Sequence, residues 1–402
     1  MDYLPPVEDF PLLNQYKSLV YLDNAATTQK PQVVLDSIQE YYHTKNANVH
    51  RAVHELSSLA TQAFEDARRT VAGFIHASAP EELIWTRGTT ESINLVAQSF
   101  AMSVLESDSQ VVISEMEHHS NIVPWQLLCE RVGARLCAVP VLSNGTLDLQ
   151  IYEDLLAQDT CIVALTHVSN VTGVINPVQQ LTAMAHEAGA IVLIDGAQAA
   201  PHLNIDVQSI DCDFYAFSGH KMYGPTGIGV LYGRKTLLDR APPWQGGGEM
   251  IKEVQITGST YQKSPHRFEA GTPNIEGVIG LAAAIDYLTE QRKLGLQQYE
   301  QQLFSEANEA LSQIDGLSMV SSVKNRLGSL SFLIDGVHPH DLGTLLTEQN
   351  IALRTGHHCA MPLMDTLSIP GTVRPSLGLY NTKEDLEKLV DAINSACRIL
   401  RP

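Results

Sequence analysis

The sequence has no long apolar run, no closely paired cysteines and no block of basic residues. No apolar stretch reaches the roughly 18 residues that a membrane-spanning helix needs. The 6 cysteines are scattered without a C-x-x-C pair, which argues against a disulfide framework and against a zinc ribbon. A net charge of −19 without a Lys/Arg-rich block opposes nucleic-acid binding. These absences favour a protein that acts on small molecules.

The beginning of the sequence lacks the features of a secretory signal. The first 20 residues carry Asp2, Glu8 and Asp9 among prolines, in place of a basic segment followed by an apolar one. We therefore expect a cytoplasmic protein. With 402 residues, 44% of them hydrophobic and 18% charged, the chain is long enough for one large α/β domain and a smaller one.

Short apolar runs alternate with helix-like segments through much of the sequence. Runs of strand length occur at residues 83–85, 111–113, 161–165, 191–194, 214–217 and 228–232. Helices are expected between most of them, for example at 121–133 and 178–189. This alternation predicts a mainly parallel sheet with helices on both faces, and ligands beyond the carboxyl ends of the strands. Helical spacing of apolar residues, from Leu56 and Leu59 to Phe74, also predicts a helix over 55–74 with one buried face.

The pattern changes at about residue 285. A long polar helix is expected over 287–313, then a strand over 329–334, a helix from Pro339 and a closing helix from Lys383. The sequence thus predicts a large domain over residues 21–284. Residues 1–20 and 285–402 are expected to form a smaller α/β domain.

Lys221 is the most informative residue. It lies where the apolar run 214–217 gives way to glycines, so its amine is expected to be desolvated and to have a lowered pKa. Such an amine can form a Schiff base with an aldehyde. Asp195 ends another apolar run, and pyridoxal phosphate needs a lysine for its aldehyde and an acid for its ring nitrogen. For Asp195 alone, a strand-end capping role is the alternative.

The segment 88–92 follows one expected strand and begins a helical stretch. Free backbone N–H groups, the helix dipole and threonine hydroxyls could hold a phosphate there. For an isolated motif of this kind, a simple helix N-cap is the favoured alternative. Ser218 and His220 could bind the same phosphate from another loop, which strengthens the cofactor interpretation.

Adjacent histidines, His118 and His119, lie in a loop-like segment. Neighbouring histidines in a loop rarely converge on one metal ion, so we expect no metal there. A ring stacked on a cofactor, or a proton donor, is the better explanation. Gln198, shortly after Asp195, could reach the hydroxyl of a pyridoxal ring.

Residues 354–362 form a second signature, centred on Cys359. The thiol follows Arg354, His357 and His358, a basic setting that favours the thiolate. An inert buried cysteine is disfavoured because its neighbours are polar, and a metal site is disfavoured because the ligands would be contiguous. The other five cysteines lie in apolar or helical contexts and are expected in the core. Arg374 offers the planar fork that binds a carboxylate.

With both signatures in view, the sequence resembles the group II, SufS/CsdA-type cysteine desulfurases and selenocysteine lyases, which are class V, fold-type I pyridoxal-phosphate enzymes. Within this group it is nearest to the SufS type. The similarity covers almost the full length. The motifs that carry it lie at residues 21–26, 48–51, 86–91, 117–119, 166–170, 195–198, 218–221, 267–274 and 354–362.

The resemblance implies a role for each site residue. Cys359, Lys221 and His118 would be catalytic. The residues implied to bind pyridoxal 5'-phosphate are Lys221, Asp195, Gln198, Thr90, Ser218, His220, His118 and Thr272, the last from the other subunit of a homodimer. The residues implied to hold the substrate carboxylate are Arg374, Asn170 and Arg354. No metal is expected.

The implied reaction converts L-cysteine to L-alanine and leaves the sulfur as a persulfide on Cys359. The resemblance further implies a SufE- or SufU-like acceptor protein and a supply of sulfur for iron–sulfur cluster assembly. Activity on L-selenocysteine is expected too, because selenium leaves more readily than sulfur.

Three other interpretations remain open. A class V aminotransferase or a kynureninase-like lyase would use Lys221 and Asp195 but would not need Cys359. A scaffold for a sulfur-transfer complex, with weak activity of its own, is the alternative from a different class.

Overall fold

A seven-stranded sheet forms the centre of the molecule in the computed structural model, which describes residues 3–401. Its strand order is β2-β8-β7-β6-β5-β3-β4. Its strands are β2 (Leu83–Thr86), β3 (Gln110–Ser114), β4 (Arg135–Val139), β5 (Thr160–Thr166), β6 (Ile191–Asp195), β7 (Phe214–Ser218) and β8 (Gly229–Gly233). Strand β8 runs antiparallel to β2 and β7, whereas the other neighbouring pairs are parallel. The predicted α/β fold with a mainly parallel sheet is confirmed.

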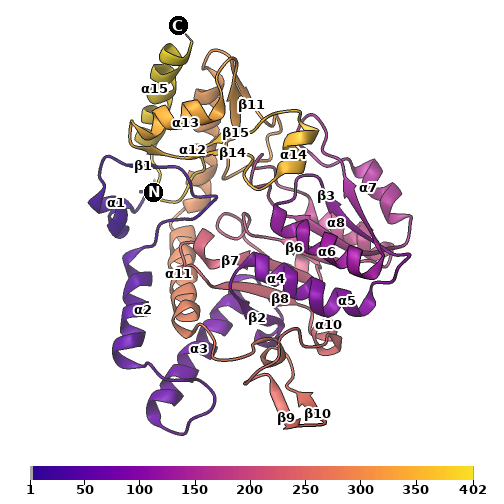
Figure 1. Cartoon of the computed structure of the whole chain (residues 1–402). Helices are drawn as coiled ribbons and strands as arrows, with labels where there is room; N and C mark the ends of the chain where they lie inside the picture. The colour runs from indigo at the N-terminus through magenta and orange to yellow at the C-terminus, as the bar shows by residue number, and fades with distance from the viewer. Residues whose placement is uncertain (1–2, 402) are drawn as a thin grey trace.

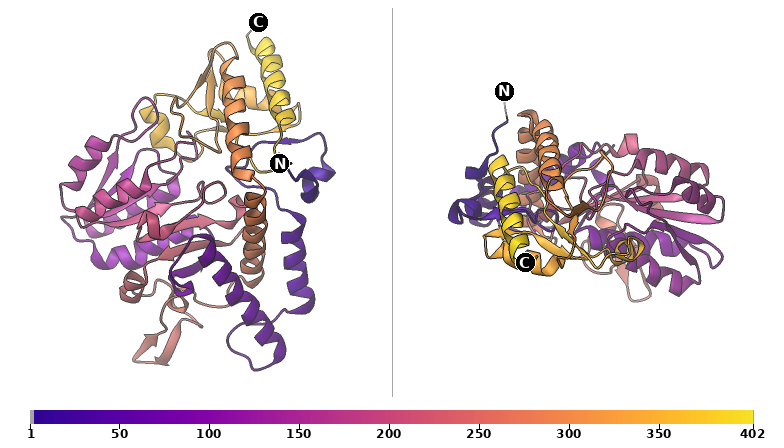
Figure 2. Two further views of the ribbon diagram at one scale, coloured as in Figure 1. Left: turned by 180° about the vertical axis from the view of Figure 1, so that it is seen from behind. Right: turned by 90° about the horizontal axis from the view of Figure 1, so that it is seen from above.

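The central strands are buried on both faces, which explains their continuous apolar sequences. Along β6, Val192 and Ile194 belong to one hydrophobic core and Leu193 belongs to the other. Phe64 belongs to the first core and Trp125 belongs to the second. The helices that carry them lie on opposite faces of the sheet. Figures 1 and 2 show this layered arrangement, with helices on both faces of the sheet.

Helices connect and cover the strands of the large sheet. They are α2 (Gln32–Thr44), α3 (Glu55–Phe74), α4 (Thr89–Val96), α5 (Met102–Val104), α6 (Val123–Val132), α7 (Leu149–Leu156), α8 (Val178–Glu187), α9 (Val207–Ile210), α10 (Lys235–Arg240) and α11 (Ile275–Lys293). The predicted helix over 55–74 coincides with α3. Its buried face is narrower than expected, because Leu56 and Leu59 are 47% and 43% exposed at its beginning.

A smaller, four-stranded sheet has the order β11-β12-β15-β14. Its strands are β11 (Leu317–Met319), β12 (Phe332–Ile334), β14 (Arg354–Gly356) and β15 (Thr372–Arg374). The helices around it are α12 (Leu296–Ser312), α13 (Pro339–Thr347), α14 (Met361–Thr366) and α15 (Lys383–Leu400). Near the N-terminus, α1 (Pro11–Gln15) precedes β1 (Val20–Tyr21), which pairs in parallel with β13 (Ile351–Ala352). This region lies at the end of the molecule where the chain finishes (Figure 1).

Two predictions for this region need correction. The single helix expected over 287–313 is divided between α11 and α12, because Gly295 adopts a left-handed backbone with φ of +106°. The strand expected over 329–334 is shorter and begins at Phe332. The predicted domain boundary between 284 and 285 falls inside α11, and this division of the chain stays a prediction.

Strands β9 (Ile251–Gln255) and β10 (Gly258–Tyr261) form an antiparallel hairpin that projects from the large sheet's end of the molecule (Figure 1). Over residues 3–401, no helix combines the length and the apolar character required to cross a membrane. All six cysteines are free thiols. Cys129 and Cys212 are buried, whereas Cys137, Cys161 and Cys397 are partly buried and pack against the edges of the cores, so the expected core placement holds in full for the first two only.

Candidate active site

A cavity of about 190 Å³ lies beyond the carboxyl ends of β5, β6 and β7. Parallel strands bring residues that are distant in sequence to the same edge of the sheet. The predicted site residues that line the cavity are Thr90, His118, Asn170, Asp195, Gln198, Ser218, His220, Lys221, Arg354 and Arg374. Cys359 and Thr272 do not line it.

Lys221 ends a short 3-10 turn that follows β7 directly. Burial lowers the pKa of Lys221 to about 8, although Asp195 opposes this shift, and Arg374 and Arg354 lower it further. A substantial fraction of the amine is therefore neutral under mildly alkaline conditions. This is the state that a lysine nucleophile or base requires.

Asp195 is the last residue of β6 and is 4% exposed. Its Oδ1 accepts a hydrogen bond of 2.9 Å from the backbone N–H of Ala197. Burial raises the pKa of Asp195, and the Ala197 N–H and Lys221 oppose that shift. Within residues 3–401 this carboxyl makes no ion pair, so it can receive a cationic group that enters the cavity.

The side of the cavity formed by Thr90, Ser218 and His220 is shaped to receive an anion. Gly88 precedes α4, and a Cβ added there would lie 3.2 Å from Oγ of Ser218. The backbone N–H of Thr89 donates to that Oγ at 2.8 Å. Hydroxyls and backbone N–H groups at a helix N-terminus are a common phosphate cradle.

His118 lies beside these groups as a neutral ring. Its Nδ1 accepts a hydrogen bond of 3.1 Å from the backbone N–H of Ser120, so the ring proton is on Nε2. Burial lowers the pKa of His118 to about 3, and Lys221 contributes to the shift. Gln198 donates through Nε2 to the backbone carbonyl of Ala25 at 2.8 Å.

Arg374 supplies a buried positive charge at the end of β15. Its side chain is 1% exposed, and it donates to the carbonyl of Asn170 at 3.1 Å and to Oδ1 of Asp23 at 3.2 Å. Its Nε has no partner within the described residues. Burial lowers the pKa of Arg374 to about 10, so it remains a cation at neutral pH. A cationic guanidinium among the residues that line the cavity is suited to a carboxylate ligand.

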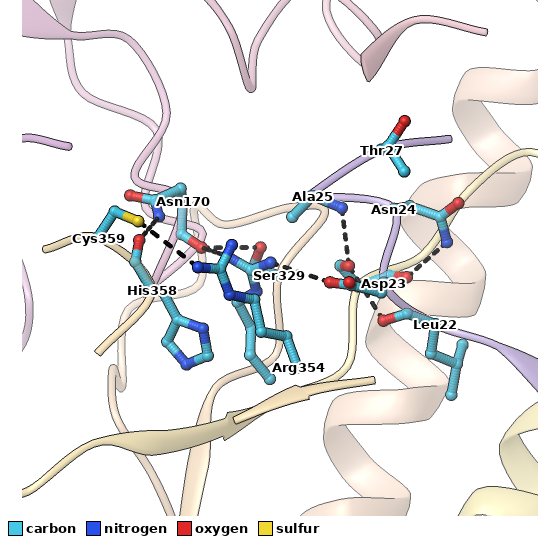
Figure 3. A network of polar contacts seen from close by, with 12 residues as sticks. Leu22, Asp23, Asn24, Ala25, Thr27, Asn170, Ser329, Arg354, His358 and Cys359 are labelled. Carbon is cyan, nitrogen blue, oxygen red and sulfur yellow. Dashed lines mark hydrogen bonds and ion pairs between the residues drawn. The ribbon is translucent and has the colours of Figure 1, made fainter. Parts of the chain in front are cut away.

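Cys359 lies on a loop between β14 and α14, next to the cavity. Arg354 donates through Nη2 to Sγ of Cys359 at 3.5 Å. The side chain of Asn170 donates to the carbonyl of His358 at 2.8 Å. In the view of Figure 3, Cys359 and Asp23 lie on opposite sides of Arg354. The thiol is therefore near the groups that line the cavity, and it is partly exposed.

Three residues close to the site were not predicted from the sequence. Asp23 forms the ion pair with Arg374, and burial raises the pKa of Asp23 despite that partner. Lys30 donates through Nζ to the carbonyl of His220 at 3.1 Å, and burial lowers its pKa to about 8. Glu117 is fully buried and accepts a hydrogen bond of 3.0 Å from the backbone N–H of Thr166, which lines the cavity. Asp23 and Glu117 fall within motifs quoted above and Lys30 lies close to one, which was the available signal.

Thr272 lies apart from the cavity of Lys221. It is exposed and lines a second hollow of about 420 Å³ together with Trp85 and Trp244. A third hollow, of about 550 Å³, includes Thr90, Ser218 and His220, so the predicted phosphate site also opens to the outer surface. Over residues 3–401, no cluster of His, Cys, Asp and Glu side chains could hold a metal ion.

The aminotransferase class-V family model matches residues 20–389. A probable cysteine desulfurase of Vibrio cholerae serotype O1 is 49% identical over 394 residues, which are 97% of each chain. A cysteine desulfurase of Yersinia pestis is 48% identical over 396 residues, which are 98% of this chain and 97% of the relative. These matches show the family along nearly the full length.

Solved structures agree with this assignment. The cysteine desulfurase CsdA from Escherichia coli, in an S-sulfonic acid form, has a TM-score of 0.92 and 41% identity, covering 99% of this chain and 100% of its own. The apo cysteine desulfurase from Thermococcus onnurineus has a TM-score of 0.94 and 40% identity, covering 99% of both chains. The resemblance to group II cysteine desulfurases is confirmed.

The cavity fits pyridoxal phosphate on its own chemistry. Lys221 has a weakly basic amine for the aldehyde, and Asp195 has an unpaired buried carboxyl for a ring N–H. Thr90, Ser218 and His220 line the cavity beside the N-terminus of α4, where hydroxyl and N–H groups suit a phosphate. With the family match, these features lead to one conclusion: the chain belongs to the class-V aminotransferase family and is a pyridoxal-phosphate-dependent cysteine desulfurase.

Proposed function

We propose that the enzyme transfers sulfur from L-cysteine to Cys359, and that the resulting persulfide is passed to an acceptor protein for iron–sulfur cluster assembly. The observation that carries this proposal is the 3.5 Å contact between Nη2 of Arg354 and Sγ of Cys359, at the edge of the cavity that holds Lys221 and Arg374. This contact holds the sulfur atom beside residues that line the cavity, where a thiol can act as a nucleophile toward a bound substrate.

Residues of the chain would hold the cofactor in a fixed orientation. Lys221 would bind its aldehyde carbon, and Asp195 would keep its ring nitrogen protonated. His118 would stack on the ring, and Gln198 would contact the ring hydroxyl. Thr90, Ser218 and His220 would bind the phosphate, for which Ser218 already lies at the N-terminus of α4. When bound, pyridoxal phosphate supplies an electron sink for negative charge at the substrate Cα.

The substrate carboxylate would bind Arg374, with Asn170 and Arg354 beside it. Arg374 lines the cavity, and its ion pair with Asp23 orients the guanidinium for this contact. The neutral Nζ of Lys221 then removes the proton from Cα. Because this amine has a pKa of about 8, it can accept the proton and later return it near neutral pH.

Sulfur transfer would follow at Cys359. Its Sγ attacks the substrate sulfur, a S–S bond forms and the Cβ–S bond breaks, with the electron pair remaining on carbon. The two sulfur atoms are formally oxidised, and Cβ is reduced and protonated. In sum, the enzyme thiol and L-cysteine give an enzyme persulfide and L-alanine, and no other reactant is required.

A homodimer would complete the phosphate site. Thr272 is exposed and distant from its own Lys221 cavity, while the cradle at Thr90, Ser218 and His220 opens to the outer surface. The partner subunit's Thr272 could cover that opening. A SufE- or SufU-like protein would then collect sulfur from the partly exposed Cys359. L-selenocysteine is a second proposed substrate, because the same atoms would transfer selenium.

A single-turnover experiment tests the sulfur-transfer step. The yellow holoenzyme is mixed with L-cysteine, L-alanine is measured, and the Cys359 peptide is analysed by mass spectrometry. We expect stoichiometric alanine and the mass of one added sulfur atom on that peptide. Cys359→Ser is expected to abolish both but to retain the cofactor absorbance, whereas Cys397→Ser, a partly exposed thiol on α15, serves as the matched control. Alanine without sulfur on Cys359 would contradict the proposal, and transamination would indicate an aminotransferase.

A further inference from the structure

The loop that carries Cys359 has an unusual backbone. His358 and Cys359 have φ values of +52° and +59°, a left-handed conformation that residues other than glycine rarely adopt. Two such residues in succession persist only when surrounding contacts hold them. The groups that hold this loop therefore determine where the thiol lies.

His119 contacts the loop on both sides of Cys359. Its backbone N–H donates to the carbonyl of Cys359 at 2.7 Å. Its ring Nε2 accepts a hydrogen bond of 3.1 Å from the backbone N–H of Met361. The ring also lies against that of His357, with 5.8 Å between centroids, and Nδ1 of His357 accepts from the backbone N–H of Cys359 at 3.1 Å.

The contact with Met361 fixes the state of the His119 ring. Nε2 can accept a hydrogen bond only if it carries no proton, so the ring is neutral with its proton on Nδ1. Burial lowers the pKa of His119, and the neighbouring His357 adds to the shift. The neutral form is thus the one present at neutral pH.

His119 immediately follows His118, which lines the cavity. The same short segment therefore contacts the cavity through one residue and the thiol loop through the next. We infer that His119 is a positioning residue: its Nε2 and backbone N–H hold the Cys359 loop in the conformation that places Sγ beside Arg354. This inference rests on the proposed role of Cys359 as the sulfur acceptor.

Two side-chain variants of His119 distinguish the effect of losing the hydrogen-bond acceptor from the effect of changing the side-chain volume. His119→Leu removes the acceptor at similar volume, whereas the Oε1 of His119→Gln can still accept from Met361. The matched control is His43→Leu, an exposed histidine of α2. We expect persulfide formation on Cys359 to slow roughly fivefold in His119→Leu, the usual effect of losing one hydrogen bond. His119→Gln should recover most of the rate.

A backbone variant tests the other half of the same contact. Met361 is the first residue of α14, where proline is well tolerated, so Met361→Pro removes the donor N–H without disturbing the helix. We expect it to slow persulfide formation about as much as His119→Leu. The double variant should be no slower than either single variant, because both remove one contact.

All variants are compared as holoenzymes, with three measurements. These are the visible absorbance of the cofactor and its change on adding L-cysteine, the alkylation rate of Cys359 by iodoacetamide, and the single-turnover persulfide yield. A positioning role leaves the first unchanged and alters the second and third. The inference is overturned if His119→Leu forms the persulfide at the wild-type rate, if His119→Gln is as slow as His119→Leu, or if the effects of the two single variants add. If the wild type itself forms no persulfide on Cys359, it is the proposed function that fails.

Discussion

Lys221 and Cys359 approach one cavity from supports of different kinds. Lys221 follows β7, a fully buried strand paired on both sides within the large sheet. Cys359 follows the three-residue strand β14 and lies on a loop with left-handed backbone. The first support belongs to the hydrophobic cores, whereas the second depends on hydrogen bonds to other loops.

We call Lys221 and Asp195 the floor of the cavity and the Cys359 loop its rim. The two differ in how they are supported. A hydrogen bond between loops contributes only about 1 kcal/mol, so a rim can move while the fold stays intact. A strand buried on both faces cannot move without disturbing packing. The difference suits the proposed chemistry, in which the cofactor keeps one fixed geometry while Cys359 reaches the substrate and later releases the sulfur.

The largest expected effect comes from the floor. Lys221→Ala should lower the rate of alanine formation by roughly a thousandfold or more, as expected when a general base is removed, and should abolish the wild-type cofactor absorbance. The same assay and a visible spectrum measure both effects. Lys45→Ala, which removes an exposed ion pair with Glu40, is the control and should behave as the wild type. Residual activity close to wild type would remove Lys221 from the mechanism.

A change at the boundary between floor and rim should affect substrate binding. Arg374→Lys keeps the charge but loses the bidentate fork and the contact with Asp23, so kcat/KM for L-cysteine should fall by roughly 10- to 100-fold, mainly through KM. The cofactor absorbance should not change. Arg398→Lys, near the end of α15, is the control. An unchanged KM would show that another group holds the carboxylate.

The pH dependence of cofactor uptake distinguishes the floor from the rim without mutation. The pKa of Lys221 is about 8, and only the neutral amine attacks an aldehyde, so the rate of reconstitution should rise with pH and level off above about 8. The measurement is the growth of visible absorbance after apoenzyme is mixed with pyridoxal phosphate. Because the rim has no part in this step, Cys359→Ser should give the same profile. A rate that still rises steeply at pH 10, near the ordinary lysine pKa, would contradict the prediction.

The smallest effect concerns Glu117, which connects the floor to the segment that holds the rim. It accepts hydrogen bonds from Asn121 and from the backbone N–H of Thr166, at 2.7 and 3.0 Å. Burial raises its pKa from 4.5 to about 8. Between these values the folded state binds the proton more tightly than the unfolded state, so this contribution to the free energy of unfolding falls as pH rises through about 8.

Glu117→Gln tests this linkage because its amide does not titrate. Urea unfolding between pH 5 and pH 9 should show a shallower decline of stability with pH in the variant than in the wild type. Glu309→Gln, on α12, controls for the loss of one charge. Parallel curves for the wild type and Glu117→Gln would show that this carboxyl is ionised throughout.

Much of the floor could be predicted from the sequence. The apolar runs that predicted strands correspond to β2, β3, β5, β6, β7 and β8, and Asp195 and Ser218 are the last residues of β6 and β7. Strand β4 was missed, because its side chains are partly exposed and it has no continuous apolar run. Such predictions succeed because a central strand is buried on both faces and is therefore apolar at consecutive positions.

The rim could be predicted only in part. The sequence indicated that Cys359 lies in a basic setting, but it did not indicate that His119 bonds to the backbone of Cys359 and Met361. The pairing of Asp23 with Arg374 joins residues far apart in the chain, and neither has a pattern that predicts the other.

Local patterns in the sequence account for the strands, the residues at their ends and the chemical groups available to the site. Each of these depends on local patterns of apolar residues and on the side chains present. The tertiary structure decided which groups meet: Arg354 with Cys359, Asp23 with Arg374, His119 with the thiol loop, and Thr272 away from its own cavity. These contacts depend on how the two sheets and their loops pack. Packing brings together residues that share no local sequence pattern.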